Sequence, residues 1–137
     1  MADHEENFDP LFYGIPHLEN NDFDSNGTLL PFKGKYVIVM FFATWCGPCK
    51  KFKPEQSKLH KKHKNSDSIV VAVMNGSGKT TLNSEQDLMK RLRDTVVPDF
   101  QGFPTIALFG PDGKLLGTHE GKRTAEDVEN SLRKYMK

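Results

Sequence analysis

The sequence has 137 residues, of which 27% are charged, and its formal net charge is +1. A chain of this length is typical of one domain that buries its own core, and so small a net charge gives no global reason to expect nucleic acid or an anionic membrane as a partner. No run comes near the roughly 20 consecutive apolar residues that cross a bilayer, so the sequence predicts no membrane-spanning helix and no membrane partner.

The first half of the chain predicts an arm, an edge strand, a central strand and a helix. Residues 1–12 are mostly polar and acidic, and we expect a loose N-terminal arm there. Residues 13–18 predict a short edge strand, because Pro16 is tolerated at a sheet edge but not in a central strand. Residues 37–42 are apolar without alternation, as in strands covered on both faces. Residues 48–63 then predict a helix with an apolar face.

A second strand and helix follow in the middle of the chain. Residues 69–74 form another unbroken apolar run and predict a second buried strand. Ser84 followed by Asp87 has the spacing of an N-terminal capping box. It predicts a helix that carries Leu88 and Leu92 on its apolar face.

The last third of the chain predicts a hairpin and a final helix. Residues 105–109 and 114–118 flank a Gly-Pro-Asp-Gly turn, which indicates two antiparallel strands. Thr124 and Asp127 have capping spacing and predict the start of a last helix. Strands alternating with helices and ending in a hairpin predict an α/β fold with a mixed central sheet flanked by helices on both faces. We therefore expect one domain over residues 13–137.

The only two cysteines, Cys46 and Cys49, are separated by two residues. A structural disulfide gains most from closing a long loop, so this pair is better interpreted as reactive or metal-binding. Residues 1–6 are acidic and lack the apolar core of a secretory signal, which favours a cytoplasmic location.

The pair lies between the predicted central strand and the start of the following helix. The strand places Cys46 at the carboxyl edge of the sheet, and the helix N-terminus supplies unpaired N–H groups and the positive end of its dipole. Both stabilise a thiolate, the nucleophilic form of cysteine, and Lys50 adds positive charge nearby. We predict that Cys46 attacks a substrate disulfide and that Cys49, one turn deeper, resolves the mixed disulfide.

A zinc site is the alternative interpretation of the cysteine pair. His60 and His63 complete a spacing similar to that of zinc ligands. However, Cys49 and His60 fall on one predicted helix, where a rise of about 1.5 Å per residue separates them by roughly 16 Å. Zinc ligands sit about 2.0–2.3 Å from the metal, so we expect no metal site.

Residues 42–50 are Phe-Ala-Thr-Trp-Cys-Gly-Pro-Cys-Lys. This motif resembles that of the thioredoxin family, and it is the strongest part of a match that runs from residue 15 to residue 132. Pro54 falls where the family has a helix-kinking proline, and residues 102–105 match the family's Gly-x-Pro-Thr, whose proline follows a cis bond. Two further family glycines are matched by Gly113 and Gly121. The resemblance implies the thioredoxin fold.

The resemblance also assigns roles to individual residues. It makes Cys46 the nucleophile and Cys49 the resolving thiol, in agreement with the positions of the two residues. The backbone of Phe103 would pair with an extended substrate by strand addition, and Trp45 would form a wall of the substrate surface. The residues that would support the active site are Trp45, Gly47, Pro48, Lys50 and Pro104. The residues that would bind substrate are Trp45, Phe103, Pro104 and Gly121.

The dipeptide Gly47-Pro48 is similar to that of the reducing thioredoxins, whereas protein disulfide isomerases have Gly-His between their cysteines. Thioredoxin itself has a redox potential of about −270 mV, against about −180 mV for the isomerase. Residues 121–127, in contrast, resemble the closing segment of isomerase domains. The sequence therefore predicts a reductase and leaves an isomerase or weak oxidant as the alternative.

Met40 departs from the family pattern, which has a buried carboxylate six residues before the first cysteine. That carboxylate helps to deprotonate the resolving cysteine. Methionine packs well in a core strand but cannot titrate, so we expect a slower resolving step. The family's lysine on the next strand is absent too, because Val73 stands in its place.

Two other departures concern the surface. An insert between Asn75 and Phe100 contains Gly-Lys-Thr at residues 78–80, which resembles the end of a phosphate-binding loop, but Val73 stands where that motif needs its first glycine. We expect the insert to reshape partner contacts instead. The helix after the cysteines is rich in lysine, which indicates either a solvated face or one that steers acidic partners towards Cys46.

The predicted activity is the reduction of protein disulfides by the dithiol of Cys46 and Cys49. The resemblance implies disulfide-containing protein substrates and an electron donor similar to thioredoxin reductase, with NADPH acting only through that reductase. No bound cofactor and no nucleic acid are expected, and the chain is expected to be a monomer. A module of the same fold that binds a partner, with redox chemistry secondary, is the alternative from another functional class.

Overall fold

The computed structural model describes residues 12–76 and 85–136 of the chain. The elements in chain order are β1 (His17–Leu18), the 3-10 helix η2 (Asn20–Asp22), β2 (Tyr36–Phe42), α2 (Gly47–His63), β3 (Ile69–Asn75), α3 (Glu85–Arg91), the π-helical turn η3 (Leu92–Val96), β4 (Thr105–Phe109), β5 (Leu115–Thr118) and α4 (Ala125–Arg133). The order of strands and of the longer helices is the one that the sequence predicts.

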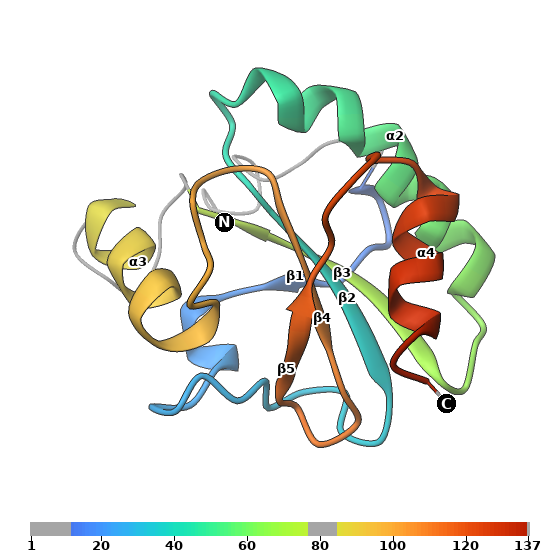
Figure 1. The fold of residues 1–137 in the computed structure, drawn as a ribbon, viewed down its shortest axis with the longest axis horizontal. Helices are drawn as coiled ribbons and strands as arrows, with labels where there is room; N and C mark the ends of the chain where they lie inside the picture. The colour runs from blue at the N-terminus through green and yellow to red at the C-terminus, as the bar shows by residue number, and fades with distance from the viewer. Residues whose placement is uncertain (1–11, 77–84, 137) are drawn as a thin grey trace.

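The five strands form one mixed sheet with the order β1-β3-β2-β4-β5 (Figure 1). β1, β3 and β2 are parallel, whereas β4 pairs antiparallel with β2 and β5 antiparallel with β4. β2 is therefore the central strand, and its Val39 lies between Ala72 on one side and Ala107 on the other. The predicted mixed sheet and α/β class are confirmed.

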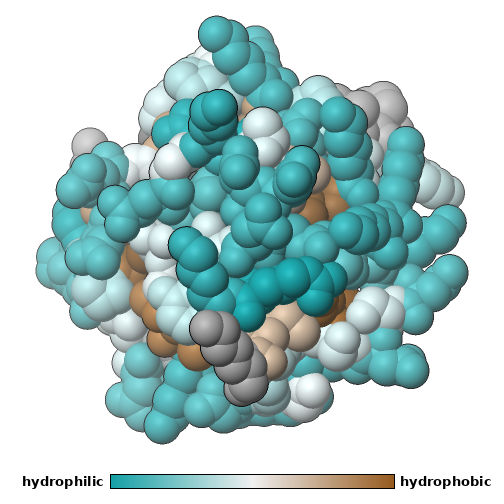
Figure 2. All heavy atoms as spheres, turned by 45° about the vertical axis from the view of Figure 1, so that its right-hand side comes forward, coloured by the Kyte–Doolittle hydropathy of each residue, from teal (hydrophilic) through white to brown (hydrophobic). Residues whose placement is uncertain are grey.

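Both faces of β2 are buried, which explains its unbroken apolar run. Side chains alternate between the two faces of a strand, so Met40 and Val39 belong to different layers of the core. The layer under α2 and α4 includes Ile38, Met40, Phe42, Phe52, Leu59, Val128 and Leu132. The layer under α3 includes Val37, Val39, Phe41, Leu88 and Leu92. Helices thus cover both faces of the sheet, as predicted, and the outer surface on the α4 side is mostly hydrophilic (Figure 2).

The N-terminal strand lies at the sheet edge, as predicted, but it is shorter than expected. Only His17–Leu18 is strand, because Gly14 has a φ of +82° and Pro16 has no N–H to donate. The carbonyl of Pro16 still accepts a hydrogen bond from Val73 N at 3.0 Å. Phe12 lies at the predicted boundary of the arm and is buried, with its ring 5.2 Å from that of Phe42. The rest of the predicted arm lies outside the described residues.

Helix α4 begins as its sequence predicts. Thr124 is the N-cap, its Oγ1 accepts a hydrogen bond from Asp127 N at 3.1 Å, and it donates one to Asp127 Oδ2 at 2.8 Å. The predicted apolar face of the middle helix differs, because Leu92 lies in η3 rather than in α3, although it is buried. The predicted cap Ser84 and the Gly-Lys-Thr run at 78–80 lie outside the described residues.

Candidate active site

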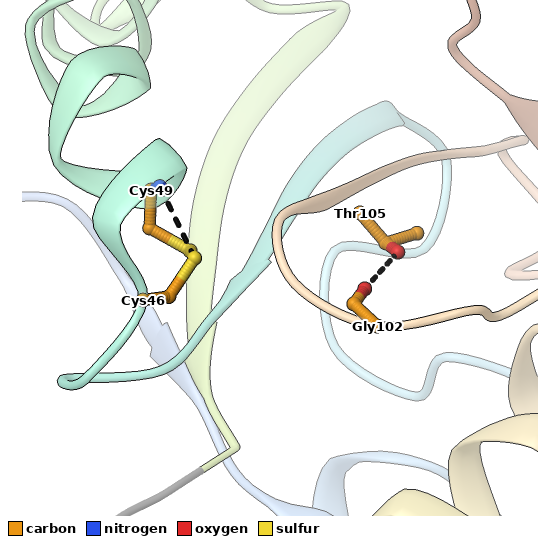
Figure 3. The surroundings of a disulfide bond; sticks show 4 residues. All are labelled: Cys46, Cys49, Gly102 and Thr105. Atoms are coloured by element: carbon orange, nitrogen blue, oxygen red, sulfur yellow. Dashed lines mark hydrogen bonds between the residues drawn. A yellow bond between two sulfur atoms is a disulfide. The ribbon is translucent and has the colours of Figure 1, made fainter.

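The cysteine pair lies where the central strand gives way to α2. β2 ends at Phe42, and Cys46 is the N-cap of α2, with an extended backbone of φ −84° and ψ 113°. A disulfide joins Cys46 to Cys49 across the first helical turn, with a Cα–Cα distance of 5.3 Å (Figure 3). The backbone N–H of Cys49 donates a hydrogen bond to Cys46 Sγ at 3.1 Å. A donor held there by the helix also stabilises negative charge on Cys46 when the pair is reduced.

The two sulfur-bearing residues differ in their access to solvent. Cys46 is 3% exposed and Cys49 is fully buried, and Cys49 belongs to the core layer under α2. Gly47, Pro48 and Lys50 around them are exposed. A partner can therefore reach the disulfide from the first turn of α2, where Cys46 is the more accessible cysteine. This is the order of exposure that the sequence predicts.

An aromatic surface stands beside the disulfide. Trp45, which directly precedes Cys46, is 61% exposed. Its ring meets that of Phe103 edge to face with centroids 5.8 Å apart, and Phe103 in turn meets Phe100 at 5.2 Å. The structure thus brings together two of the residues to which the family resemblance assigns substrate binding. Phe100, which is not among the predicted site residues, is buried and packs against Phe103.

The turn before β4 faces the disulfide in Figure 3. The Phe103–Pro104 peptide bond is cis, as the resemblance implies, and Pro104 is buried. Thr105 Oγ1 donates a hydrogen bond to the carbonyl of Gly102 at 2.6 Å, which closes the turn from within. Gly121 is exposed and lines neither of the pockets described below.

Gly76 sets the position of Phe103, a role that sequence reasoning missed. Its N–H donates to the carbonyl of Phe42 at 2.7 Å, which fixes it at the end of the sheet. A Cβ at Gly76 would overlap the Phe103 ring, with Cε1 only 2.7 Å away. The absence of a side chain at residue 76 therefore leaves room for the Phe103 ring, which contacts Trp45 edge to face.

We expect Gly76→Ala to push the Phe103 ring away from Trp45. Overpacking of this kind costs about 1–3 kcal/mol of unfolding free energy, and the emission of the single tryptophan should shift because its ring contact is lost. Chemical denaturation and Trp45 fluorescence measure the two effects. In a Phe103→Leu background the same glycine substitution should cost clearly less, and equal costs in both backgrounds would contradict the contact.

Met40 lies opposite Val73 in the register of β2 and β3, in the same core layer as Cys49. Neither side chain can titrate. Among the described residues, the buried side chains with a titratable group other than the cysteines are those of His63 and Glu129, and they pair with each other. His63 stands at the far end of α2, about 21 Å along the axis from Cys49. Among the described residues no buried carboxylate therefore lies near Cys49, and the slower resolving step stays a prediction.

Two pockets flank this region and share Arg123. The first contains Gly102, Phe103 and Pro104 from the turn, and the second contains Gly47 and Pro48 from the disulfide loop. Sequence reasoning did not select Arg123, since an arginine in a polar turn carries no signal of its own. Neither a cluster of three or more metal-ligating side chains nor a helix able to cross a membrane is found among the described residues.

The family model described as Thioredoxin matches residues 15–134. The chain belongs to the thioredoxin family. It is 37% identical over 93 residues to protein disulfide-isomerase 2-3 of Arabidopsis thaliana, covering 68% of this chain and 18% of that protein. It is 33% identical over 113 residues to protein disulfide-isomerase like 2-2 of the same plant, covering 82% of this chain and 22% of that protein.

Solved structures show the same fold. The first thioredoxin domain of mouse protein disulfide-isomerase A4 matches with a TM-score of 0.57 and 24% identity, over 88% of this chain and 74% of that one. Human ERp44 form II matches with a TM-score of 0.63 and 18% identity, over 90% of this chain and 30% of that one. The chain spans about a fifth of the length of the plant relatives, 18% and 22%. The Cys46–Cys49 disulfide lies within the residues that the family model matches.

Proposed function

We propose that the protein reduces disulfides in other proteins through the dithiol of Cys46 and Cys49. The observation that carries the proposal is the disulfide between these residues at the N-terminus of α2, with one sulfur-bearing residue slightly exposed and the other buried. The Gly47-Pro48 dipeptide supports the reducing direction, because it is the pair found in reducing thioredoxins.

The reaction passes two electrons from the protein to its substrate. The Cys46 thiolate attacks one sulfur of the substrate disulfide, whose S–S bond breaks as a Cys46–substrate disulfide forms and the other substrate sulfur leaves as a thiolate. Cys49 then gives up its proton to solvent and attacks Cys46 Sγ. The second substrate sulfur is released, and the Cys46–Cys49 disulfide is the oxidised product. An electron donor similar to thioredoxin reductase then restores the dithiol, and a reducing compartment such as the cytoplasm suits this cycle.

Disulfide isomerase activity is the second candidate. It is favoured by the similarity to two plant proteins named protein disulfide-isomerase and to a domain of protein disulfide-isomerase A4. An isomerase must leave its disulfide easier to reduce than that of a reductase. The potentials of the two classes, about −270 and about −180 mV, differ by roughly 4 kcal/mol, so one measurement separates them.

We expect the Cys46–Cys49 pair to have a redox potential near −270 mV. The protein would be equilibrated in graded mixtures of reduced and oxidised dithiothreitol, and Trp45, which adjoins Cys46, would report the fraction oxidised. Alkylation and mass spectrometry of the same samples give the fraction by an independent method. A potential near −180 mV or higher would overturn the reductase and favour isomerase or oxidant work.

A further inference from the structure

A groove opens directly beside the disulfide. Its volume is about 600 Å³, and it is lined by Gly47, Pro48, Lys51, Phe52 and Arg123. Gly47 and Pro48 lie between the two cysteines in sequence, so anything that occupies the groove lies next to the S–S bond. The floor is apolar, and the two cations come from different elements, α2 and the turn before α4. We call this the Lys51–Arg123 groove.

Arg123 separates the groove from a pocket of opposite charge. That neighbouring pocket, of about 390 Å³, also contains Arg123 but includes the carboxylates of Asp99 and Glu120. The described residues that line the Lys51–Arg123 groove include no carboxylate. A negatively charged side chain is therefore repelled on one side of Arg123 and attracted on the other.

Within residues 12–76 and 85–136, neither cation of the groove pairs with another side chain. Lys58 pairs with Glu55 at 3.2 Å, and Lys62 lies 2.9 Å from a Glu129 carboxylate oxygen. The side chains of Lys51 and Arg123, in contrast, make no hydrogen bond or ion pair with any residue that the structure describes. Both are exposed, so their charge is open to a partner.

The nearest carboxylate on α2 does not compete for these cations. Glu55 Oε1 accepts a hydrogen bond from Ala125 N at 2.9 Å, and its other oxygen pairs with Lys58. This contact also ties the start of α4 to α2. On the other side of Arg123, His119 donates from Nε2 to the carbonyl of Lys122 at 2.6 Å. The backbone on both sides of Arg123 is therefore held in place before any partner arrives, which lowers the cost of binding.

We propose that the Lys51–Arg123 groove binds an acidic side chain of the substrate protein, a glutamate or aspartate close in sequence to the reacting cysteine. The proposal rests on the proposed disulfide chemistry and adds a substrate preference to it. The apolar floor accommodates the methylenes of the acidic side chain, while the two cations hold its carboxylate. Disulfides flanked by acidic residues then react faster than neutral or basic ones.

The test uses three peptides that share one internal disulfide and differ only in whether its flanking residues are glutamate, glutamine or lysine. Second-order rate constants with the reduced full-length protein are measured by separating peptide dithiol from peptide disulfide. We expect the glutamate peptide to react about five- to ten-fold faster than the glutamine peptide at low ionic strength, and the ratio to approach one in about 0.5 M salt.

Substitution locates the effect. Lys51→Ser combined with Arg123→Ser should bring the glutamate-to-glutamine ratio close to one. Lys61→Ser is the matched control, because it removes an exposed lysine of the same helix about 15 Å further along. It should leave the ratio unchanged. A wild-type ratio near one, or a ratio that survives the double substitution, overturns the proposal.

A binding measurement keeps this proposal separate from the proposed function. The glutamate peptide with both cysteines changed to serine is titrated into the oxidised protein, and Trp45 fluorescence is followed. Saturable binding that the double substitution abolishes supports the proposed role of the groove. That result holds even if the protein reduces none of the three peptides, an outcome that would overturn the proposed reductase activity. If all three peptides are reduced at the same rate and no binding is seen, the proposed binding of acidic side chains is wrong, whereas the proposed reductase activity is supported.

Discussion

Replacement of Cys49 by serine is expected to stop turnover after the first step and to lower steady-state disulfide reduction by about 10³-fold or more. Cys46 keeps its place at the N-cap of α2 and still receives the N–H of residue 49, because that donor is a backbone group. The first attack therefore survives, but no thiol remains to release the substrate. Mass spectrometry of the Cys49→Ser protein should show one substrate chain attached per protein, removable by dithiothreitol.

Cys46→Ser is the matched control for this experiment. It should lose turnover to a similar extent but form no adduct, since the remaining thiol at Cys49 is fully buried in the core layer under α2. An adduct on the Cys46→Ser protein would reverse the two roles. The lifetime of the mixed disulfide in the wild-type protein can also be measured. We expect it to be long, because neither Met40 nor Val73, which lie opposite each other, can accept a proton from Cys49.

The elements that the sequence predicts are those whose signal is local. The apolar run of β2 needs no partner to be recognised, because a strand buried on both faces has no polar positions. Thr124 and Asp127 are three residues apart and form hydrogen bonds with each other. The cysteine pair is local in the same sense, since the strand before it and the helix after it place both residues without any distant contact.

The features that the sequence did not predict join distant parts of the chain. Gly76 is important because the Phe103 ring lies against it, and the residues next to Gly76 in the sequence do not indicate this contact. The role of Arg123 depends on Lys51, which lies more than seventy positions earlier in the sequence and lines the same groove of the folded chain. The cis bond before Pro104 is a different case, since the resemblance to the family motif predicted it although most bonds before proline are trans.

The ion cluster around Glu129 is the other long-range feature, and it joins α4 to the end of α2. The Glu129 side chain is 10% exposed. His63 Nε2 lies 2.7 Å from Glu129 Oε1, and Arg133 Nε donates to Oε2 at 2.9 Å. Lys62 contacts the same carboxylate at 2.9 Å. Burial alone would raise the pKa of Glu129, but the hydrogen bonds from Lys62, His63 and Arg133 outweigh it and lower the pKa to about 2.

We expect Glu129→Gln to lower the free energy of unfolding by about 2–3 kcal/mol at pH 7. The difference between the folded pKa of about 2 and the value of 4.5 in model compounds sets the upper end of this range of free energy. Solvent around the exposed ends of Lys62 and Arg133 weakens their interaction with Glu129 and sets the lower end. Urea denaturation of both proteins measures this difference. Glu126→Gln, an exposed glutamate on the same helix, is the control and should cost less than about 1 kcal/mol.

The pH dependence decides whether the charge of Glu129, rather than its shape, produces the effect. A carboxyl with a lowered folded pKa stabilises the fold fully above its unfolded pKa, near 4.5, and loses that contribution as the pH falls towards 2. The stability gap between wild type and Glu129→Gln should therefore be largest above about pH 5 and close as the pH approaches 2. Other carboxyls titrate in both proteins alike and cancel in the difference. A gap that stays constant from pH 7 to pH 2.5 would mean that the glutamine fails to pack, and that the ion cluster contributes no stability through its charge.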